Sequence, residues 1–342
     1  MTRRLRVAVL AGGRSSEHEI SLASAASVAA ALDPDRYEVT TVEIDRDGRW
    51  ALPAAGAREV EPATAIESLP VPAGSAPTTL AAVDVVLPIL HGPFGEDGTV
   101  QGLLELAGIP YVGPGVLASA LCMDKDVFKH VMRAQEVPVA RHRLLRPGDP
   151  VDNPFGYPVF VKPARLGSSV GISKVRDADA LAGAVALARR HDDKVLVEEF
   201  VDGIEIEVGV LGNLPSPIAS VPGQVVSHHA DWYDTASKYD EGGSELLIPP
   251  PGLSEGQVDR ARELALRAFA ATECEGMARI DFFVRETDGE VVLNELNTIP
   301  GFTRTSFYSR LFEASGIPYA ELVDRLITLA LERHERRRDL AY

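Results

Sequence analysis

The sequence contains little cysteine, and this scarcity excludes two classes of protein. Of its 342 residues only two are cysteine, Cys122 and Cys274, and neither stands in a CxxC or Cys/His spacing. A disulfide-stapled scaffold or a cysteine-rich zinc site needs more ligands at closer spacing. The composition therefore favours a reducing compartment.

Long apolar runs are also missing. No segment approaches the roughly 18 apolar residues that a membrane-spanning helix needs. The start, MTRRLRVAVLAGG, reaches a glycine pair after a short apolar run, which predicts a first strand rather than the core of a signal peptide. We therefore expect a soluble, cytoplasmic protein without a membrane partner.

Positive charge is scarce as well. The chain has 34 Lys and Arg against 50 Asp and Glu, for a formal net charge of -16. A general nucleic-acid binder would present a basic surface, so no nucleic-acid partner is expected. The 45% hydrophobic content is typical of a globular protein, and the length suggests two or three domains.

The first third of the chain has an α/β pattern. Strands and helices alternate there, as in a Rossmann-like domain, whereas the proline-rich stretch 53–80 has no periodicity and is expected to be irregular. The expected elements are a strand at 6–10, a helix at 17–32, and strands at 37–44 and 83–89 followed by a helix at 100–107.

The remainder has the pattern of an α+β fold. Short β-rich runs surround a helix at 178–190, and a single helix is expected around MDKDVFKHVM. Further on come a polar loop at 228–243, a helix at 255–272, a hairpin at 278–297 and a terminal helix after Pro318. The change of pattern places a domain boundary between Ile109 and Leu121.

Two common nucleotide-binding motifs do not occur. There is no G-K-[ST], and the glycine pair near the start lacks the G-x-G-x-x-G spacing. Instead, RLGSSVG follows the strand-like VFVKPA, and glycines with hydroxyl side chains allow backbone N–H groups to turn toward an anion near Lys162. The sequence therefore predicts a phosphate-binding loop at 167–171.

Two alternatives compete for this loop. Residues 167–171 match G-x-S-x-G, the nucleophile elbow of serine hydrolases, but that motif requires a helix after its serine, whereas ISKV has a strand pattern. The other alternative is an ordinary Gly-Ser hairpin turn.

A second polar cluster lies in the C-terminal hairpin. Asp281 is on one strand, and Glu295 and Asn297 share one face of the other. A three-residue loop at 287–289 with a left-handed Gly289 would place Asp281 opposite Glu295. Hard oxygen ligands favour Mg²⁺ or Mn²⁺. The alternative is a solvated strand end, but strand interiors are poor in Asp and Asn, so the cluster favours a metal.

Taken together, these residues resemble the ATP-grasp superfamily and, within it, the D-alanine–D-alanine ligase family. The resemblance covers nearly the whole chain. Its motifs occur in the family's order: GGRSSEHEISL, HGPFGEDGTVQG, MDK, VFVKPARLGSSVG, VEEFV, ASKY, RIDFF and NELNTIPGFTRTS. Several are individually weak, but their ordered co-occurrence is highly specific. The resemblance implies a three-domain ATP-grasp fold with a Rossmann-like N-terminal α/β domain, and we expect the domains at 1–120, 121–217 and 218–342.

By this resemblance the chain binds ATP and two ions of Mg²⁺ or Mn²⁺. Two lysines, a backbone loop and a metal suit a polyanion, because phosphoryl transfer depends on positioning and charge neutralisation. The implied metal ligands are Asp281, Glu295 and Asn297. The implied nucleotide contacts are Lys125, Lys162, Ser168, Ser169, Glu198, Glu199, Val201, Glu205, Lys238, Asn294 and Glu295. Alone in its helix, Lys125 would be interpreted as a solvated charge.

The resemblance also implies the reaction, which joins two D-alanine molecules through a D-alanyl phosphate, for peptidoglycan precursor synthesis. Arg279 and the backbone N–H of Gly301 would stabilise the tetrahedral oxyanion. The implied catalytic residues are Glu17, Ser168, Tyr239, Arg279 and Gly301. The implied substrate contacts are Glu17, His91, Arg279, Gly301, Ser306 and Phe307.

Each acceptor-side residue also has a structural alternative. Glu17 lies beside a possible capping box formed by Ser16 and Glu19. Arg279 and Asp281 could form a surface pair worth ~0 to 1 kcal/mol. Ser306 could cap the following helix, and His91 could be a loop histidine with a structural hydrogen bond.

The segment DWYDTASKYDEGG resembles the family's mobile loop, with Lys238 reaching phosphate and Tyr239 hydrogen-bonding toward Glu17 and Ser168. Closure would shield the acyl phosphate from water. Vancomycin-resistance ligases that make D-alanine-D-lactate lack this Lys-Tyr ending, which favours an amine as second substrate here. Ile204 and Arg304 depart from the family pattern, and Arg304 stands near the second-substrate site.

Three rival functions remain open at this stage. They are the same ligase chemistry with D-serine or D-lactate as second substrate, a non-catalytic ATP-binding regulator, and the serine hydrolase. The family resemblance also implies a homodimer.

Overall fold

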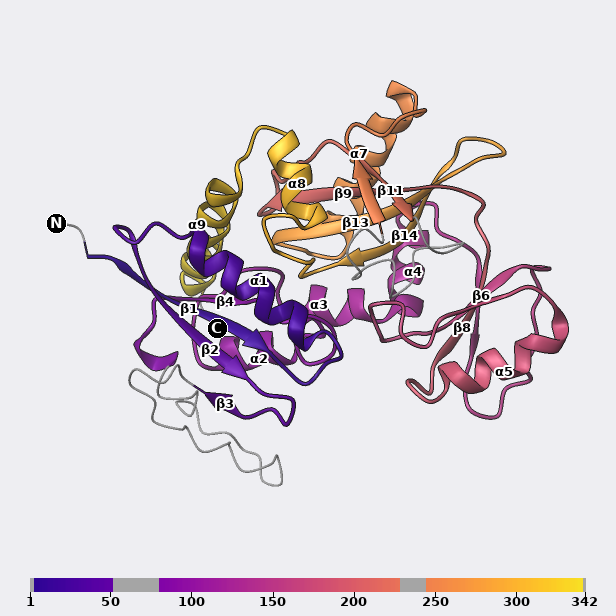
Figure 1. The fold of residues 1–342 in the computed structure, drawn as a ribbon, viewed down its shortest axis with the longest axis horizontal. Coiled ribbons are helices and arrows are strands. Elements are labelled where there is room, and N and C mark those ends of the chain that lie inside the picture. Colours follow the sequence, from indigo (N-terminus) through magenta and orange to yellow (C-terminus); the bar gives the residue numbers. More distant parts are fainter. Residues whose placement is uncertain (1–2, 52–79, 228–243, 341–342) are drawn as a thin grey trace.

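The structure is a computed structural model that describes residues 3–51, 80–227 and 244–340. Within these residues the chain forms three sheets (Figure 1). Most of the expected irregular stretch at 53–80 and the expected loop at 228–243, with Lys238 and Tyr239, lie outside the described residues. No helix in the described part is long and apolar enough to span a membrane.

The first sheet is the expected α/β unit. Its order is β3-β2-β1-β4, and β1 runs parallel to both β2 and β4. A parallel strand covered on both faces reads as a continuous apolar run, as VAVLAG does here. The strands are β1 (Leu5–Gly12), β2 (Tyr37–Ile44), β3 (Trp50–Ala51) and β4 (Val85–Pro88), and the short helix η1 (Leu80–Ala82) precedes β4.

Helices cover both faces of this sheet. Val7 and Val9 pack in one apolar cluster with α1 (His18–Ala31) and the C-terminal helix α9 (Tyr319–Arg338). Ala8 and Leu10 point the other way and pack with residues of α2 (Thr99–Leu106). The two ends of the chain therefore share one core, and α9 lies beside α1 in Figure 1.

The second sheet is small and antiparallel, in the order β5-β8-β6-β7. Its apolar residues pack against α5 (Ala178–Ala188). Asp177 is the N-cap of this helix, and its side chain accepts a hydrogen bond from Ala180 N. Its strands are β5 (His142–Leu145), β6 (Val159–Pro163), β7 (Ser173–Val175) and β8 (Val195–Glu199).

The third sheet has the order β12-β11-β9-β13-β14, with β10 paired to β9. Its strands are β9 (Gly203–Gly212), β10 (Ile218–Ala219), β11 (Gly223–Ser227), β12 (Ser244–Leu247), β13 (Gly276–Arg285) and β14 (Val291–Asn297). The helix α7 (Glu255–Ala271) packs on it and starts with a capping box formed by Ser254 and Gln257. Strand β9 ends before residue 218, where the third domain is expected to start, and yet it pairs within this sheet.

The expected single helix around MDKDVFKHVM is two helices. α3 (Val116–Met123) and α4 (Lys125–Ala134) are separated by Asp124, whose backbone is extended and whose side chain accepts from Val127 N at 3.2 Å. An aspartate in this conformation is a good N-cap, so a new helix starts there. As a result Lys125 is the first residue of α4.

The hairpin of β13 and β14 brings Asp281 opposite Glu295, as the sequence predicted, but by a different route. The three-residue loop was wrong, because Arg285 N donates to Glu290 O at 2.9 Å and residues 286–289 form the turn. Gly289 has the expected left-handed backbone, with a φ of 72°. A bulge between Asp281 and Phe282 then shifts the register and restores the predicted pair.

Candidate active site

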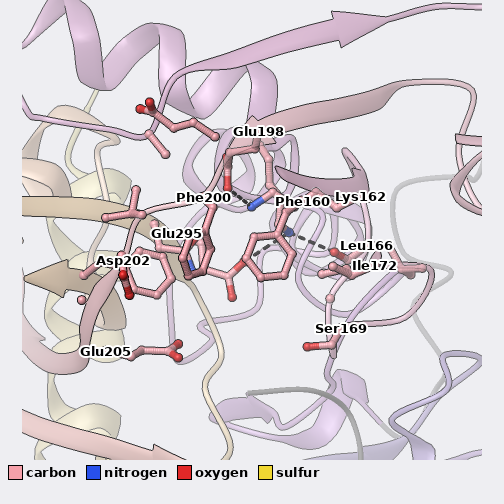
Figure 2. A pocket seen from close by; sticks show the side chains of 18 of the residues that line it. Phe160, Lys162, Leu166, Ser169, Ile172, Glu198, Phe200, Asp202, Glu205 and Glu295 are labelled. Carbon is pink, nitrogen blue, oxygen red and sulfur yellow. Dashed lines mark hydrogen bonds and ion pairs between the residues drawn. The ribbon is translucent and has the colours of Figure 1, made fainter. Parts of the chain in front are cut away.

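A cavity of about 230 Å³ lies between the second and third sheets, lined by residues from β6, β8, β9, β13 and β14 (Figure 2). Ten of the eleven residues that the resemblance implied for the nucleotide line this cavity: Lys125, Lys162, Ser168, Ser169, Glu198, Glu199, Val201, Glu205, Asn294 and Glu295. The eleventh, Lys238, lies outside the described residues. The segments that carry the predicted nucleotide contacts thus meet at one place.

A buried charge cluster forms the back of this cavity. Lys162 Nζ lies 2.5 Å from Glu198 Oε1, and Lys129 Nζ lies 2.9 Å from Glu198 Oε2. Burial alone would raise the pKa of Glu198, but the positive charges of Lys129 and Lys162 outweigh it and lower that pKa to about 2. Glu198 is therefore a carboxylate at neutral pH. The sequence did not single out Lys129.

Lys125 is buried rather than solvated. Its Nζ donates to Leu166 O at 2.9 Å and lies 3.3 Å from Glu295 Oε2, and only 7% of the residue is exposed. The interpretation of Lys125 as a solvated surface charge is therefore wrong. Lys125 thus links α4 to Leu166, directly before the 167–171 loop, and to β14 at the cavity.

The 167–171 loop has a backbone that is unusual for its residues. Ser168 and Ser169 have φ of 53° and 58°, and Gly171 has a φ of 72°. Non-glycine residues in the left-handed region cost of order 1–3 kcal/mol and cluster at functional sites. Strand β7 follows at Ser173, so the helix required by a nucleophile elbow is missing and the serine hydrolase interpretation is wrong.

Aromatic side chains add an apolar wall that sequence reasoning missed. Phe160 and Phe200 both line the cavity, with ring centroids 6.1 Å apart. In Figure 2 they lie between the Lys162–Glu198 pair and the side chains of Glu205 and Ser169. The rings are inclined by 47°, and an apolar wall with polar groups at its ends suits a nucleobase attached to a sugar. Only their place beside predicted polar contacts could have marked these phenylalanines.

A second cavity of about 330 Å³ adjoins the first, because Ser168 and Glu295 line both. All six residues that the resemblance implied for the amino-acid substrates line it: Glu17, His91, Arg279, Gly301, Ser306 and Phe307. They come from the first sheet's helix and loop and from the segments around β13 and α8 (Phe307–Ala314). Ser168 Oγ donates a short hydrogen bond to Glu17 Oε1 and so connects the two cavities.

The helix-capping alternatives for the acceptor side are wrong. Glu17 itself stands at the N-cap of α1 without a capping hydrogen bond, and the capping box of Ser16 and Glu19 does not form. Ser306 precedes α8 without capping it, because its Oγ accepts from Thr303 N at 2.9 Å instead. Both side chains instead line the second cavity.

Arg279 and Asp281 form a largely buried pair rather than a surface one. Arg279 donates from Nε and Nη2 to the two oxygens of Asp281, each at 2.8 Å. Its Nε also lies 3.1 Å from Glu207 Oε2, a carboxylate that the sequence did not single out. Two carboxylates from β9 and β13 thus hold the guanidinium at the cavity wall.

The predicted metal ligands lie together beside this arginine. Asn297 Nδ2 donates to Asp281 Oδ2 at 2.9 Å, and Glu295 faces Asp281 across the hairpin. Carboxylate and amide oxygens are a donor set that suits Mg²⁺ or Mn²⁺. Glu295 lines both cavities, so the residues fit a cation located between a nucleotide and an acceptor.

His91 makes the structural hydrogen bond that was the alternative to a binding role, and it also lines the second cavity. Its Nδ1 lies 2.9 Å from Ile299 O, and its Nε2 lies 3.4 Å from Ser24 Oγ. Burial lowers the pKa of His91, so the ring is neutral at physiological pH and its donor nitrogen is fixed by the carbonyl.

Glu96, in the HGPFGEDG loop, is a cavity residue that sequence reasoning missed. Its carboxyl accepts from Gly92 N at 2.7 Å and Ile299 N at 3.0 Å. Burial, and then the nearby charge of Glu17, raise the pKa of Glu96 to about 8. The loop thus joins the first sheet to the segment that carries Gly301.

Replacing Glu96 by glutamine is expected to change how stability depends on pH. The raised pKa of Glu96 contributes stability that is present below pH 4.5, the ordinary value, and is lost as the pH rises through about 8. The unfolding free energy of wild type minus that of Glu96→Gln should fall by up to about 1.4 kcal/mol per pH unit in this window. Denaturant unfolding at several pH values measures it, and parallel curves would contradict it.

The two departures from the family pattern lie away from the polar walls. Ile204 packs against the apolar cluster between the third sheet and α7. The backbone N of Arg304 donates to Ser27 Oγ at 3.0 Å, and its side chain is not among those that line the second cavity, whereas Thr303 and Thr305 are.

One group of three possible metal ligands occurs among the described residues away from these cavities: Asp126, His130 and His142. His142 Nε2 lies 3.0 Å from Asp126 Oδ1, and Arg133 Nη2 donates to His142 Nδ1 at 2.9 Å. The arginine makes Nδ1 an acceptor, so Nε2 carries the proton and donates to the aspartate. Lys194 also pairs with Asp126 at 3.1 Å. The group is therefore a hydrogen-bonded ion cluster.

Comparisons with known proteins cover the same regions. A family model described as "D-ala D-ala ligase N-terminus" matches residues 6–114, and one described as "D-ala D-ala ligase C-terminus" matches residues 131–328. A relative from Deinococcus radiodurans, named D-alanine–D-alanine ligase, is 48% identical over 341 residues, which cover 96% of this chain and 98% of that protein.

Two solved structures are similar as well. The VanG D-Ala:D-Ser ligase from Enterococcus faecalis gives a TM-score of 0.82 at 32% identity, covering 96% of this chain and 100% of that one. The D-alanine–D-alanine ligase from Bacillus anthracis complexed with ATP gives a TM-score of 0.77 at 26% identity, covering 97% and 99%. Each similarity extends over almost the whole of both chains.

Proposed function

The chain belongs to the D-alanine–D-alanine ligase family and joins two D-alanine molecules into D-alanyl-D-alanine with ATP, and we propose that its two adjoining cavities divide this reaction between them. The first cavity binds ATP, and the second binds both amino acids. The products are the dipeptide, ADP and phosphate, and the dipeptide is used for peptidoglycan precursors. The adjacency of the cavities through Ser168 and Glu295 supports this division.

On the nucleotide side, the base lies against the apolar wall of Phe160 and Phe200, and the ribose lies near Glu205. Lys125, Lys162 and the 167–171 loop contact the phosphates. A net charge of -16 makes such a local reversal of sign necessary for a polyanionic substrate. The buried lysines of the first cavity supply this positive charge at a place where water screens it little.

The residues Asp281, Glu295 and Asn297 would hold Mg²⁺ or Mn²⁺, and we propose two ions. When bound, the metal supplies positive charge to the phosphates. Arg279, fixed by Asp281 and Glu207, stands next to these ligands at the second cavity. The metal ligands and the acceptor-side cation are therefore held by one hydrogen-bonded unit.

In the second cavity, an oxygen of the first D-alanine carboxylate attacks the γ-phosphorus of ATP. The bond from that phosphorus to the β–γ bridging oxygen breaks, ADP leaves, and a D-alanyl phosphate forms. The second D-alanine loses its ammonium proton to water, and its amine attacks the acyl carbon. The bond from that carbon to the phosphate oxygen breaks, and phosphate leaves with this oxygen. Glu17 holds the ammonium of the first D-alanine, and Arg279 with Gly301 N–H stabilises the tetrahedral oxyanion.

The remaining predictions complete the proposal. His91, Ser306 and Phe307 contact the amino acids, while Lys238 and Tyr239 belong to a loop that closes over the site. The three domains meet at the cavities. Because β9 pairs within the third sheet, we propose that the central domain, expected at 121–217, ends before residue 203. We also propose a cytoplasmic homodimer.

ADP release with a panel of acceptors tests the function. D-alanine should support ADP and phosphate release in equal amounts to dipeptide, whereas a nucleotide-binding regulator would release neither. Because the similar VanG protein is a D-Ala:D-Ser ligase, the panel includes mixed reactions of D-alanine with D-serine and with D-lactate, with the products separated by mass. A preference for either over D-alanine would overturn the proposed second substrate.

A further inference from the structure

Lys129 is a completely buried lysine that lies behind the nucleotide cavity rather than in it. It stands one helical turn after Lys125 on α4, and none of its surface is exposed. Its Nζ lies 2.9 Å from Glu198 Oε2 and 3.4 Å from Asn294 O. A buried lysine is costly unless it is paired, so its charge depends on these two partners.

The partner of Lys129 is also the partner of Lys162. Glu198 on β8 uses Oε1 for Lys162 and Oε2 for Lys129, so one carboxylate is held from two sides. Burial lowers the pKa of Lys129, and the charge of Glu198 opposes that shift. With both lysines protonated, the three groups carry a net charge of +1. Without Lys129, Glu198 would neutralise Lys162, and the back of the cavity would lose its attraction for a polyanion.

The position of Lys129 also joins the two walls of the cavity. Through Glu198 it reaches the second sheet, and through Asn294 O it reaches β14 of the third sheet. At the start of α4, a separate cluster in which Lys194 contacts Asp124 at 2.7 Å and Asp126 at 3.1 Å ties the helix to the second sheet. Among the described residues of α4, Lys129 is the one that forms an ion pair with Glu198, the carboxylate that contacts Lys162.

We propose that Lys129 is a positioning residue for the nucleotide: it holds Glu198 by its second oxygen, which fixes the side chain of Lys162 and leaves its positive charge available to ATP. This inference rests on the proposed function, because it assigns Lys129 to the nucleotide half of that site. It acts on ATP binding more than on the chemical step, since Lys129 does not line either cavity.

The Lys129→Met variant tests this role, because methionine has similar length without the charge. We expect the KM for ATP to rise by about 10- to 100-fold, the range for partners that orient a ligand-binding group, with a much smaller change in kcat. Calorimetric titration with a non-hydrolysable ATP analogue should show the same loss of affinity. An unchanged KM and affinity would overturn the inference.

Lys194→Met is the matched control. Lys194 is also a buried lysine paired with carboxylates of the same region, but it contacts neither Glu198 nor the cavities. Its loss should lower thermal stability while changing the KM for ATP by less than about threefold. An equal rise in KM for both variants would show that Lys129 acts only through general stability.

A double variant shows whether Lys129 acts through Glu198. In a Glu198→Gln background, adding Lys129→Met should change the KM for ATP by less than about threefold, because the interaction is already lost. A full additional loss would overturn the proposed route. The double variant leaves neither charge of the buried pair without its partner, so it can still be measured if Lys129→Met alone does not fold.

The proposed function fails in a different way. If the wild-type protein releases no ADP with D-alanine, the ligase assignment is wrong. If wild type turns over normally and Lys129→Met retains its KM for ATP, only the role of Lys129 is wrong.

Discussion

Replacing Lys162 by methionine is expected to lower kcat/KM for ATP by about 10²- to 10³-fold, the effect of losing one preorganised group that stabilises developing charge. The variant removes one of the two lysines that line the nucleotide cavity, leaving Lys125, and it leaves Glu198 paired with Lys129. The cluster at the back of the cavity then falls from a net charge of +1 to neutral. Both KM for ATP and kcat should suffer, because the charge acts on bound ATP and on the transferring phosphoryl group.

Steady-state kinetics with saturating D-alanine measure this effect, and thermal unfolding separates it from instability. Lys194→Met again provides the control, since each lysine is 6% exposed and paired with a carboxylate. If Lys162→Met keeps near-normal kcat/KM, or if Lys194→Met loses as much, then Lys162 has no special place in the nucleotide site.

The candidate site could be predicted from the sequence where its residues are close together in the chain. The pairing of Asp281 with Glu295 follows from strand periodicity and the left-handed glycine of one hairpin. Even there, the prediction missed two features whose effects on the register cancel. The turn is longer than the predicted three-residue loop, and a bulge beyond it restores the predicted pair; side-chain patterns do not reveal such a bulge. Local register is therefore easier to predict in outcome than in cause.

Buried charge could not be predicted in the same way. Lys125, Asp126 and Lys129 give α4 a surface-like composition, yet all three are buried because the facing strands carry their counter-ions. The partners of Lys129 are Glu198 and the carbonyl of Asn294, far away in sequence. Periodicity identifies apolar faces, and it says nothing about a charge that is satisfied only after three sheets come together.

The helix caps illustrate a third limit. A serine followed three residues later by a glutamate predicts a capping box, and Ser254 with Gln257 forms the equivalent one. Ser16 and Glu19 have the same spacing but form none, and Glu17 instead receives a hydrogen bond from Ser168, 151 residues later. A contact of that separation competes with local capping. The family resemblance placed both residues near Tyr239, but it did not predict their direct hydrogen bond.

The other large effect is expected for Asp281→Asn. The substitution keeps the shape of the side chain and removes the charge that would hold a divalent cation and that fixes Arg279 through two hydrogen bonds of 2.8 Å. We expect kcat to fall by about 10²- to 10³-fold, with a higher Mg²⁺ concentration needed for half-maximal rate. Because Arg279 retains Glu207 at 3.1 Å, the fold should persist and the loss should be largely catalytic.

Asp84→Asn is the matched control for this prediction. Asp84 is also held by the two nitrogens of an arginine fork, with Arg6 Nε at 3.3 Å and Nη2 at 3.1 Å, but it lies next to β4 of the first sheet, away from both cavities. Its loss removes an Arg–Asp pair without touching the proposed metal ligands, so kcat and the Mg²⁺ requirement should stay as in wild type. Equal losses in the two variants would mean that Asp281 serves the fold alone. A loss confined to Asp281→Asn, with unchanged thermal unfolding, would locate the metal and the acceptor-side cation in one charged unit of the hairpin.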